Sequence, residues 1–466
     1  MRWMSFYFFL LTGYGALAQN WQPVSEEQFF GQKAIYTLHS DTDLDGLYVG
    51  GDFDGIGNNS SLRSIALWKE GQWHALANGL NSYQFTASLR DMTTYNGNLY
   101  VGGFLTDADG VVCNGIARWN GAQWSALDGG VTHSDGDPGQ AWGMRVIEDE
   151  LYVCGRFVHV GDLTVNGLAK WNGTSWSAVH DFPFFDVEGD VVHDCIVYND
   201  ELFVIGDFNG GPANGMSGIA RWNGTEWVGV GPVGVGQAIC MEIYQNKLYV
   251  AGYFTSEMNP IYPGRHIASW DGSNWDNVGG GLGNPNGPVY DMLVHDDKLY
   301  AVGSFMNAGG TPAQFIATWD GHEWCDLETV VSNGLLAIEA FQDTVYIGGG
   351  PVSLNGSDLM SIAKSGEPAE NEICGTLASV QRELTENSNL TVYPNPASTH
   401  ITVNSKVALQ QVRVLDVRGR MVLEQTLKQV QGEVRLNTND LPSGIYMLEA
   451  ITQNGARAVR KFVVER

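Results

Sequence analysis

The stretch LYVGGF at Leu99–Phe104, followed by IARWNGAQW at Ile116–Trp124, decides the fold because both strings return at regular intervals. The second string has a counterpart in six copies, which together hold 12 of the 15 tryptophans. Self-similarity with a period of about fifty residues is typical of repeat architectures. The other copies of the first string are LYVGGDF at Leu47, LYVCGRF at Leu151, LFVIGDF at Leu202, LYVAGYF at Leu248, LYAVGSF at Leu299 and VYIGGG at Val345.

Each copy predicts four short strands, because aromatic and β-branched runs alternate with turns such as NGN and WNG. A series of four-stranded units predicts an all-β fold, a seven-bladed β-propeller over residues 19–366. The seventh copy ends at Ser361–Lys364 without a fourth strand, whereas NWQPV at Asn20–Val24 has the pattern of one. We therefore expect the N-terminal strand to complete the last blade, which removes an exposed sheet edge.

The glycine pair and the paired tryptophans resemble those of kelch-type and galactose-oxidase-like propellers, which implies the same fold over about residues 19–366. The turns SWDGSNW at Ser269 and TWDGHEW at Thr318 resemble the Asp-box of sialidases. In those families the box is structural. The resemblance implies that Asp271 and Asp320 brace the turn between the third and fourth strands.

The first 18 residues predict a signal peptide, with Arg2, an apolar run and a small-x-small end at Ala16–Ala18. The apolar run is too short for a membrane anchor.

The 52 acidic and 25 basic residues give a net charge of −27, which excludes nucleic acid as a favoured partner. Six cysteines in an exported protein permit disulfides, although Cys154, Cys195 and Cys240 lie in apolar strands where buried thiols are typical.

The composition changes near residue 376, after which 11 basic and 8 acidic residues reverse the charge balance. After a linker at 367–388, residues 389–466 predict a small β-sandwich of alternating strands. This region resembles the type A C-terminal sorting domain of the type IX secretion system of Bacteroidota. The resemblance implies contact with that secretion machinery and its sortase, and a surface or extracellular location. It rests on Tyr393, Pro394, Asn395, Pro396, Gly419, Gly444, Tyr446 and Lys461.

The loops of an antiparallel propeller divide between two faces, and here one face has short, uniform turns while the other has long, varied loops. Binding residues favour loops on a rigid scaffold. Trp142, Phe184, Phe185 and Tyr262 belong to the varied face and can stack on a sugar or a peptide. The alternative is that each ring only packs its own loop.

Three aspartates occupy one register, eight residues before the leucine of the glycine string: Asp91, Asp194 and Asp291. They should open the innermost strands of blades two, four and six. A carboxylate ring could hold a cation or a polar ligand, but hydrogen bonding to loop amides is the favoured alternative.

Asp41, Asp43 and Asp45 have the D-x-D-x-D-G spacing of a calcium loop, with Asp52 at the twelfth position. Calcium is therefore the one cofactor that the sequence suggests. The alternative is a polar hairpin turn, because no helices flank the segment.

The predicted function is an exported binding protein that recognises a glycan or protein ligand through the varied face. Two alternatives stay open: a glycan-active enzyme, either oxidase-like or sialidase-like, and a structural or matrix component. No catalytic set of residues is evident. A sialidase-like site would need arginines, which Arg63, Arg90, Arg145, Arg156 and Arg265 could supply by position.

Overall fold

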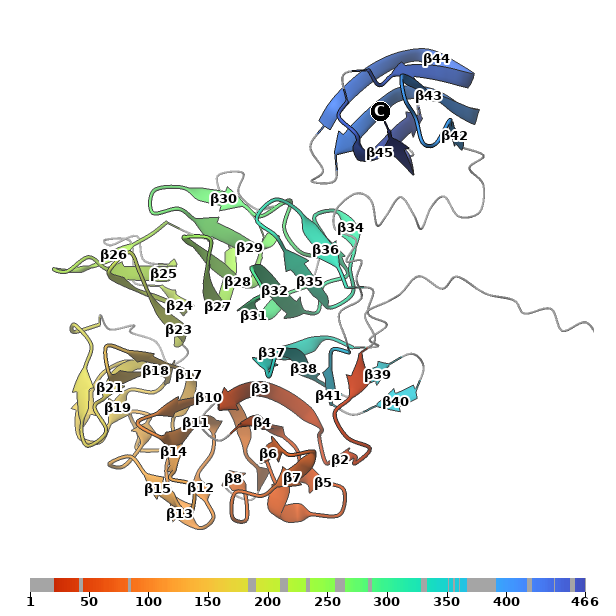
Figure 1. Ribbon diagram of the computed structural model, residues 1–466. Helices are drawn as coiled ribbons and strands as arrows, with labels where there is room; N and C mark the ends of the chain where they lie inside the picture. Colours follow the sequence, from red (N-terminus) through yellow and green to blue (C-terminus); the bar gives the residue numbers. More distant parts are fainter. Residues whose placement is uncertain are drawn as a thin grey trace, which may run out of the picture. The chain divides into compact units, whose positions relative to one another are not determined.

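The computed structural model divides into two compact units, Met1–Glu372 and Ile373–Arg466. Each unit is described separately. The described residues are 21–41, 45–82, 85–182, 190–209, 217–231, 235–255, 265–283, 287–327, 333–350, 352–354, 357–359, 361–366, 391–416, 421–439, 441–452 and 457–465. They form an all-β protein with no α-helix (Figure 1).

In the first unit, seven four-stranded antiparallel sheets correspond to the seven copies of the repeat, each with the four strands that the sequence predicts. We number them 1 to 7 along the chain. The strands of each sheet are given from first to fourth. Sheets 1 to 4 are: sheet 1, β3 (Ala34–Asp41), β4 (Gly46–Asp52), β6 (Ile65–Lys69) and β7 (Gln72–His74); sheet 2, β10 (Ser88–Tyr95), β11 (Asn98–Phe104), β14 (Ile116–Trp119) and β15 (Trp124–Ala126); sheet 3, β17 (Gln140–Ile147), β18 (Glu150–Arg156), β21 (Leu168–Trp171) and β22 (Trp176–Ala178); sheet 4, β23 (Val191–Tyr198), β24 (Glu201–Asn209), β25 (Ser217–Trp222) and β26 (Trp227–Gly229). Sheets 5 to 7 are: sheet 5, β27 (Val235–Tyr244), β28 (Lys247–Thr255), β29 (Arg265–Trp270) and β30 (Trp275–Asn277); sheet 6, β31 (Val289–His295), β32 (Lys298–Gly303), β35 (Ile316–Trp319) and β36 (Trp324–Asp326); sheet 7, β37 (Leu335–Phe341), β38 (Thr344–Gly349), β41 (Ile362–Lys364) and β1 (Gln22–Pro23).

The fourth strand of sheet 7 comes from the other end of the unit. In β1, Gln22 pairs with Lys364 and Pro23 pairs with Ala363, so the N-terminal segment pairs with the third strand of the last copy, as the sequence predicts. Trp21, just before β1, is only 4% exposed and packs between sheets 6 and 7. This pairing covers an edge of β41 that would otherwise be open.

Apolar cores lie between consecutive sheets, and Figure 1 shows the sheets arranged around a common centre. One further core joins the last sheet to the first: Ala337 and Tyr346 of sheet 7 pack with Ile35 and Leu47 of sheet 1. Neighbouring sheets are also locked by indole hydrogen bonds. In sheets 2 to 6, Nε1 of the second tryptophan of each pair donates to a carbonyl oxygen 45 to 49 residues earlier in the chain.

Several connections pair with each other outside the seven sheets, which the sequence did not predict. The segment before a first strand joins the connection between the second and third strands of the same copy. These short strands are β2 (Phe29–Phe30), β5 (Gly55–Ile56), β8 (Leu80–Ser82), β9 (Phe85–Thr86), β12 (Asp107–Ala108), β13 (Val111–Val112), β16 (Val131–Thr132), β19 (His159–Val160), β20 (Leu163–Thr164), β33 (Asn307–Ala308) and β34 (Thr311–Pro312), together with β39 (Val352–Leu354) and β40 (Ser357–Leu359) and the 3₁₀-helix η1 (Ser60–Leu62).

The turns between third and fourth strands confirm a bracing role for their first polar residue. Oδ1 of Asp271 accepts the amides of Ser273 and Asn274, and Asp320 holds the two equivalent amides of its own turn. Of the cysteines, Cys325 is disulfide-bonded, whereas four are free thiols: Cys113, Cys154, Cys195 and Cys240.

The second unit is one five-stranded sheet around a single apolar core. The strands are β42 (Thr391–Tyr393), β43 (His400–Asp416), β44 (Met421–Asn437), β45 (Gly444–Thr452) and β46 (Arg457–Val464). The sequence predicted a small β-sandwich. In the structure the long strand β43 pairs with β42, β44 and β45, and β45 also pairs with β46. The sheet curls over, because β42 contacts β46 although they are opposite ends of the strand order.

Candidate functional site

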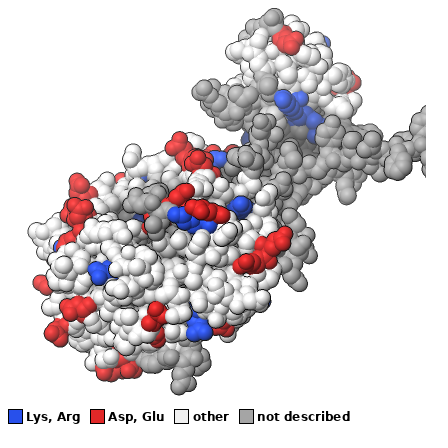
Figure 2. Space-filling view, turned by 60° about the horizontal axis from the view of Figure 1, so that its bottom comes forward, with Lys and Arg blue, Asp and Glu red and all other residues white. Residues whose placement is uncertain are grey.

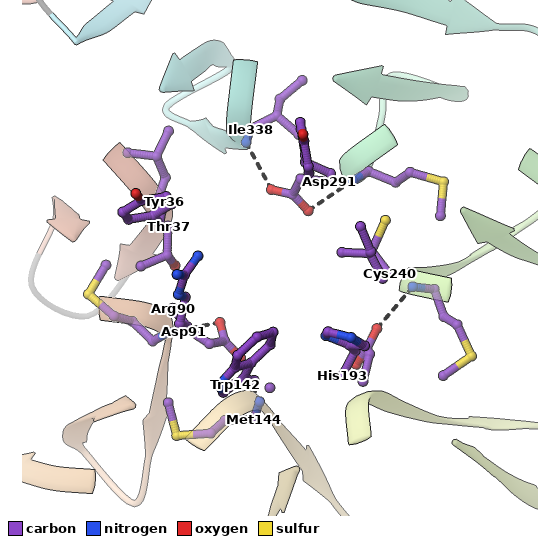
Figure 3. Close-up of a pocket in the computed structure, with 18 of the residues that line it drawn as sticks. Tyr36, Thr37, Arg90, Asp91, Trp142, Met144, His193, Cys240, Asp291 and Ile338 are labelled. Atoms are coloured by element: carbon purple, nitrogen blue, oxygen red, sulfur yellow. Dashed lines mark hydrogen bonds between the residues drawn. The ribbon is translucent and has the colours of Figure 1, made fainter. Parts of the chain in front are cut away.

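A hollow of about 730 Å³ lies among the first strands of the seven sheets, and every one of these strands contributes lining residues. We call it the central hollow. Figure 3 shows side chains from different sheets pointing toward it. The chain around it is strongly acidic overall, and Figure 2 shows acidic side chains spread over the visible face with few basic ones between them.

A β-bulge in each first strand supplies one residue to the central hollow. In β10, for example, Leu89 pairs with Gly103 and Asp91 pairs with Gly102, so Arg90 between them has no partner in the ladder. Such an extra residue bends the strand and redirects its side chain. The seven extra residues all line the hollow: Tyr36, Arg90, Trp142, His193, Ile239, Tyr290 and Leu336.

The second glycine of each repeated string makes this bulge sterically feasible. A Cβ on Gly155 would lie 2.0 Å from the carbonyl oxygen of Gln140, and the corresponding distance at Gly206 is 1.9 Å, to Val191. No side chain fits at such distances, so the close approach of the two strands at the bulge requires glycine. This is the physical reason why the second glycine is present in all seven copies.

Four of the bulge residues form one continuous cluster: the cation Arg90 and the rings of Tyr36, Trp142 and His193. The Cζ atom of Arg90 lies 4.4 Å from the centre of the Tyr36 ring and 5.4 Å from the Trp142 ring. The rings of Trp142 and His193 are 4.9 Å apart. Burial lowers the pKa of His193 to about 4, so this ring is neutral at pH 7. We call this set the aromatic arc (Figure 3).

The Arg90 guanidinium is exposed to the solvent of the hollow. Among the described residues, no hydrogen bond to it is found, and it contacts the rings of Tyr36 and Trp142. Burial lowers the pKa of Arg90, and the charges of Tyr36 and Asp52 act in the opposite direction. A guanidinium carries five N–H donors in one plane. These donors are therefore open to acceptors of a ligand.

The three aspartates in one register link neighbouring sheets. Asp91 accepts hydrogen bonds from the amides of Met92 and of Met144 in the next sheet, at 2.8 and 2.5 Å. Asp194 does the same with Cys195 and Met241, and Asp291 with Met292 and Ile338 (Figure 3). The partners are amides of first strands rather than the loop amides that the sequence favoured. Because both oxygens of each carboxylate are occupied, these residues hold sheets together and do not form an open ligand ring.

Burial dominates the titration of two of these carboxylates. It raises the pKa of Asp91 to about 7 and that of Asp291 to about 8, although the two bound amides act in the opposite direction. Asp194 also forms an ion pair with the guanidinium of Arg145, with Nε and Oδ1 3.1 Å apart. Arg145 donates a further hydrogen bond to the carbonyl oxygen of Met241.

Two glutamates complete the polar lining of the central hollow. Burial raises the pKa of Glu242 and of Glu339, and nearby Arg145 partly opposes this at Glu242. The hollow thus offers one open cation at the aromatic arc and carboxyl groups elsewhere. Such a mixed lining suits a polar ligand with hydroxyl, carboxylate or amide groups.

Only some of the other predicted site residues line the central hollow. Trp142 is half-buried in β17, within the central hollow rather than on a loop. Of the five arginines considered for a sialidase-like site, Arg90 and Arg145 line the hollow, whereas Arg63 hydrogen-bonds Asn81 outside it. Phe184, Phe185, Tyr262, Asp43 and Gly419 lie outside the described residues.

Of the predicted calcium ligands, Asp52 does not lie with the others. Asp41 pairs with Gly46 at one end of the hairpin of β3 and β4, whereas Asp52 pairs with Ala34 at the other end. Six residues of strand separate Gly46 from Asp52, about 20 Å, so one ion cannot bind both carboxylates. Asp45 instead accepts a hydrogen bond from Gln342. In the part of the chain that the structure describes, no group of three or more metal-binding side chains is present.

Several motif residues of the second unit make specific hydrogen bonds, and Asn395 binds the last strand. The side chain of Asn395 accepts a hydrogen bond from the amide of Val463 and donates one to the carbonyl of Lys461. Tyr446 donates to the carbonyl oxygen of Pro442, near Gly444. Tyr393 donates to Glu433 at 2.6 Å. Pro394 and Pro396 flank Asn395 in this stretch.

Residues 391–465 match the family described as secretion system C-terminal sorting domain. The protein is therefore a type IX secretion substrate that is exported to the cell surface or the extracellular space, as the sequence predicted. No helix among the described residues is long and apolar enough to cross a membrane. No curated protein sequence matches the chain significantly.

Several solved structures are similar to the chain. The extracellular domain of a proposed hybrid two-component system from B. thetaiotaomicron has 10% identity and a TM-score of 0.47, with 97% of this chain and 59% of that one covered. A second structure, of the extracellular domain of a proposed one-component system from the same organism, has 11% identity and a TM-score of 0.45. The match covers 97% of this chain and 60% of that one. The chain thus spans about 60% of these two relatives. PorZ, a surface component of the type IX secretion system of Porphyromonas gingivalis, has 11% identity and a TM-score of 0.25. The match covers 93% of this chain and 82% of PorZ.

Proposed function

We propose that the first unit is a closed seven-bladed β-propeller over residues 19–366, and that it acts outside the cell as a binding protein for a glycan or protein ligand. Seven sheets with similar strand order, apolar cores between successive sheets and the core that joins sheet 7 to sheet 1 support the architecture. The kelch-like character rests on the repeated glycine and tryptophan strings.

The open guanidinium of Arg90 is the observation that carries the binding function. Held between Tyr36 and Trp142, it keeps a fixed orientation at little entropic cost to a ligand. A sugar or peptide that enters the central hollow stacks on the aromatic arc and gives oxygen acceptors to Arg90. The tight bulge geometry makes the arc rigid before the ligand arrives.

The remaining regions serve delivery in this proposal. Residues 1–18 direct export across the inner membrane and are removed, and residues 367–388 connect the propeller to the sorting domain. The sorting domain, residues 389–466, is cleaved by the sortase after it has directed passage through the outer membrane. The propeller is thus the part that remains to bind a ligand.

The test is a glycan and peptide array probed with the secreted protein and with three variants. Arg90→Ala and Trp142→Ala should each weaken binding at least tenfold. Arg118→Ala is the matched control, because Arg118 lies in the same sheet on β14, outside the hollow, and donates to Ser125. If nothing on the array binds, or if all three variants bind like the parent protein, the proposal is wrong.

A further inference from the structure

We infer that sheet 1 carries a second binding site, separate from the central hollow, that takes a neutral saccharide. A hollow of about 470 Å³ lies beside its tryptophan pair, Trp68 and Trp73. We call it the sheet 1 pocket. Its lining comes from three segments: the chain before β2, the connection from β4 to β6, and the hairpin formed by β6 and β7.

Departures from the repeat converge on this pocket. In sheets 2 to 6 the second tryptophan donates its Nε1 hydrogen bond to a backbone carbonyl, but Nε1 of Trp73 donates to Oγ of Ser25 at 3.0 Å. The connection from β4 to β6 contains η1, the one helical turn among the described residues, with Asn59 as its N-cap. In the turn before Trp73, Lys69 stands where copies 2 to 6 have the bracing Asn or Asp.

The two indoles of the sheet 1 pocket are partly accessible, whereas the pairs of sheets 2, 3 and 6 are buried. Their ring centres are 4.8 Å apart. The edge-to-face contact of Trp73 with the buried ring of Phe29, at 5.7 Å, fixes its orientation. The two indole planes are tilted by 56° to each other, so two preoriented aromatic faces are present at the wall of a hollow.

Amide and carboxylate side chains surround these rings. Asn58, Asn59, Gln72 and Glu27 all line the pocket and are exposed. The side-chain oxygen of Asn59 accepts the amide of Ser61, which fixes its orientation. Amides both donate and accept, which matches hydroxyl groups that can do the same.

This combination selects the ligand class. A pyranose ring has C–H groups on its faces, which pack on an aromatic surface, and hydroxyls on its rim, which bond to amides. The pocket lining holds one charged side chain, Glu27, and no cation. An anionic sugar would therefore find no counter-charge here, unlike at Arg90, and a neutral saccharide fits best.

The experiment is saturation-transfer NMR and calorimetric titration of the full-length mature protein with five neutral hexasaccharides: cellohexaose, xylohexaose, maltohexaose, mannohexaose and chitohexaose. The variants are Trp73→Phe and the double variant Asn58→Ala/Gln72→Ala. Gln123→Ala is the matched control, because Gln123 is equally exposed and directly precedes the second tryptophan of sheet 2. Arg90→Ala separates this site from the central hollow.

At least one hexasaccharide should bind, with affinity at least tenfold lower in the double variant and about threefold lower in Trp73→Phe. Gln123→Ala and Arg90→Ala should bind like the parent protein. The double variant replaces exposed side chains only, so it should keep the circular dichroism and unfolding midpoint of the parent. Absence of binding to all five sugars overturns the inference, and so does binding that Arg90→Ala abolishes while the double variant leaves it unchanged.

Discussion

At the scale of single residues, the buried aspartates that join neighbouring sheets make the sharpest prediction. Asp194→Ala removes the acceptor of two amides and leaves the Arg145 guanidinium without its carboxylate. We expect a loss of about 3–5 kcal/mol in unfolding free energy, typical of a broken buried ion pair. Asp91→Ala leaves two amides without an acceptor, but it leaves no charged side chain without its partner. Its unfolding free energy should therefore fall by about 2–3 kcal/mol. Urea unfolding of both variants measures the difference.

The control for this pair is Asp271→Ala, which removes an acceptor of two amides from an exposed turn. Water replaces the lost carboxylate there, so the loss of unfolding free energy should be smaller than at Asp194 or Asp91. Equal losses at Asp194 and Asp271 would contradict the assigned role.

Asp291 predicts a dependence of stability on pH. Its folded pKa of about 8 lies well above the ordinary value near 4, so between these values the folded protein holds a proton that the unfolded chain has released. Stability therefore falls as pH rises from about 4 to about 8, by at most about 1.4 kcal/mol per pH unit for this group. Unfolding midpoints at pH 5, 6, 7 and 8 should fall less steeply in Asp291→Asn than in the parent. Parallel curves would refute the prediction.

The sequence identified some residues of the central hollow and missed others for a definable reason. The shared register of the aspartates located the first strands correctly relative to the hollow, but it did not show that main-chain amides occupy the carboxylates. Tyr36 and His193 were missed, and Arg90 was considered only for a sialidase-like site, so the three were not recognised as a group. They have no common chemistry, and only the bulge makes them equivalent. In six copies the bulge residue stands nine positions before the start of the glycine string, which is the signal that could have found them.

At the scale of elements, the second glycine of each string explains why the bulges exist. Gly155→Ala would place a Cβ 2.0 Å from the carbonyl oxygen of Gln140, and neither backbone segment can yield without breaking the ladder. We expect a loss of about 3 kcal/mol or more in unfolding free energy, at the upper end of overpacking effects. Gly121→Ala is the control: its Cβ meets no atom within 4 Å, so only its positive φ opposes the change, at about 1 kcal/mol. Similar losses in both variants would contradict this account.

The strands themselves were predictable because alternation and turn residues are local signals. The short pairings between connections, such as β16 with β19, were not, because they join segments about thirty residues apart through only two residue pairs. Asp52 was placed in the predicted calcium loop for the related reason that a linear motif says nothing about hairpin register. Asp41 and Asp52 match the spacing in sequence, yet the hairpin carries them to opposite ends.

At the scale of the whole molecule, one indole supports the closure of the propeller that we propose. Trp21 is 4% exposed and packs with Tyr300 of sheet 6 and with Leu335 and Val345 of sheet 7. Trp21→Ala removes this contact at the point where β1 completes sheet 7, and we expect a loss of about 3–5 kcal/mol in unfolding free energy. The open edge of β41 should also promote aggregation.

The matched control is Trp21→Phe. Among the described residues, Nε1 of Trp21 has no hydrogen-bond partner, so phenylalanine keeps most of the packing and gives up no hydrogen bond. The loss of unfolding free energy in Trp21→Phe should be well below that in Trp21→Ala. Amide hydrogen exchange locates the effect: in Trp21→Ala, β37 should exchange faster while β10, on another part of the ring, should not. If β10 and β37 lose protection equally, the unit unfolds as a whole and Trp21 does not act as a local closure. If neither changes, the ring does not depend on the N-terminal segment, because sheets 6 and 7 then hold together through their own core.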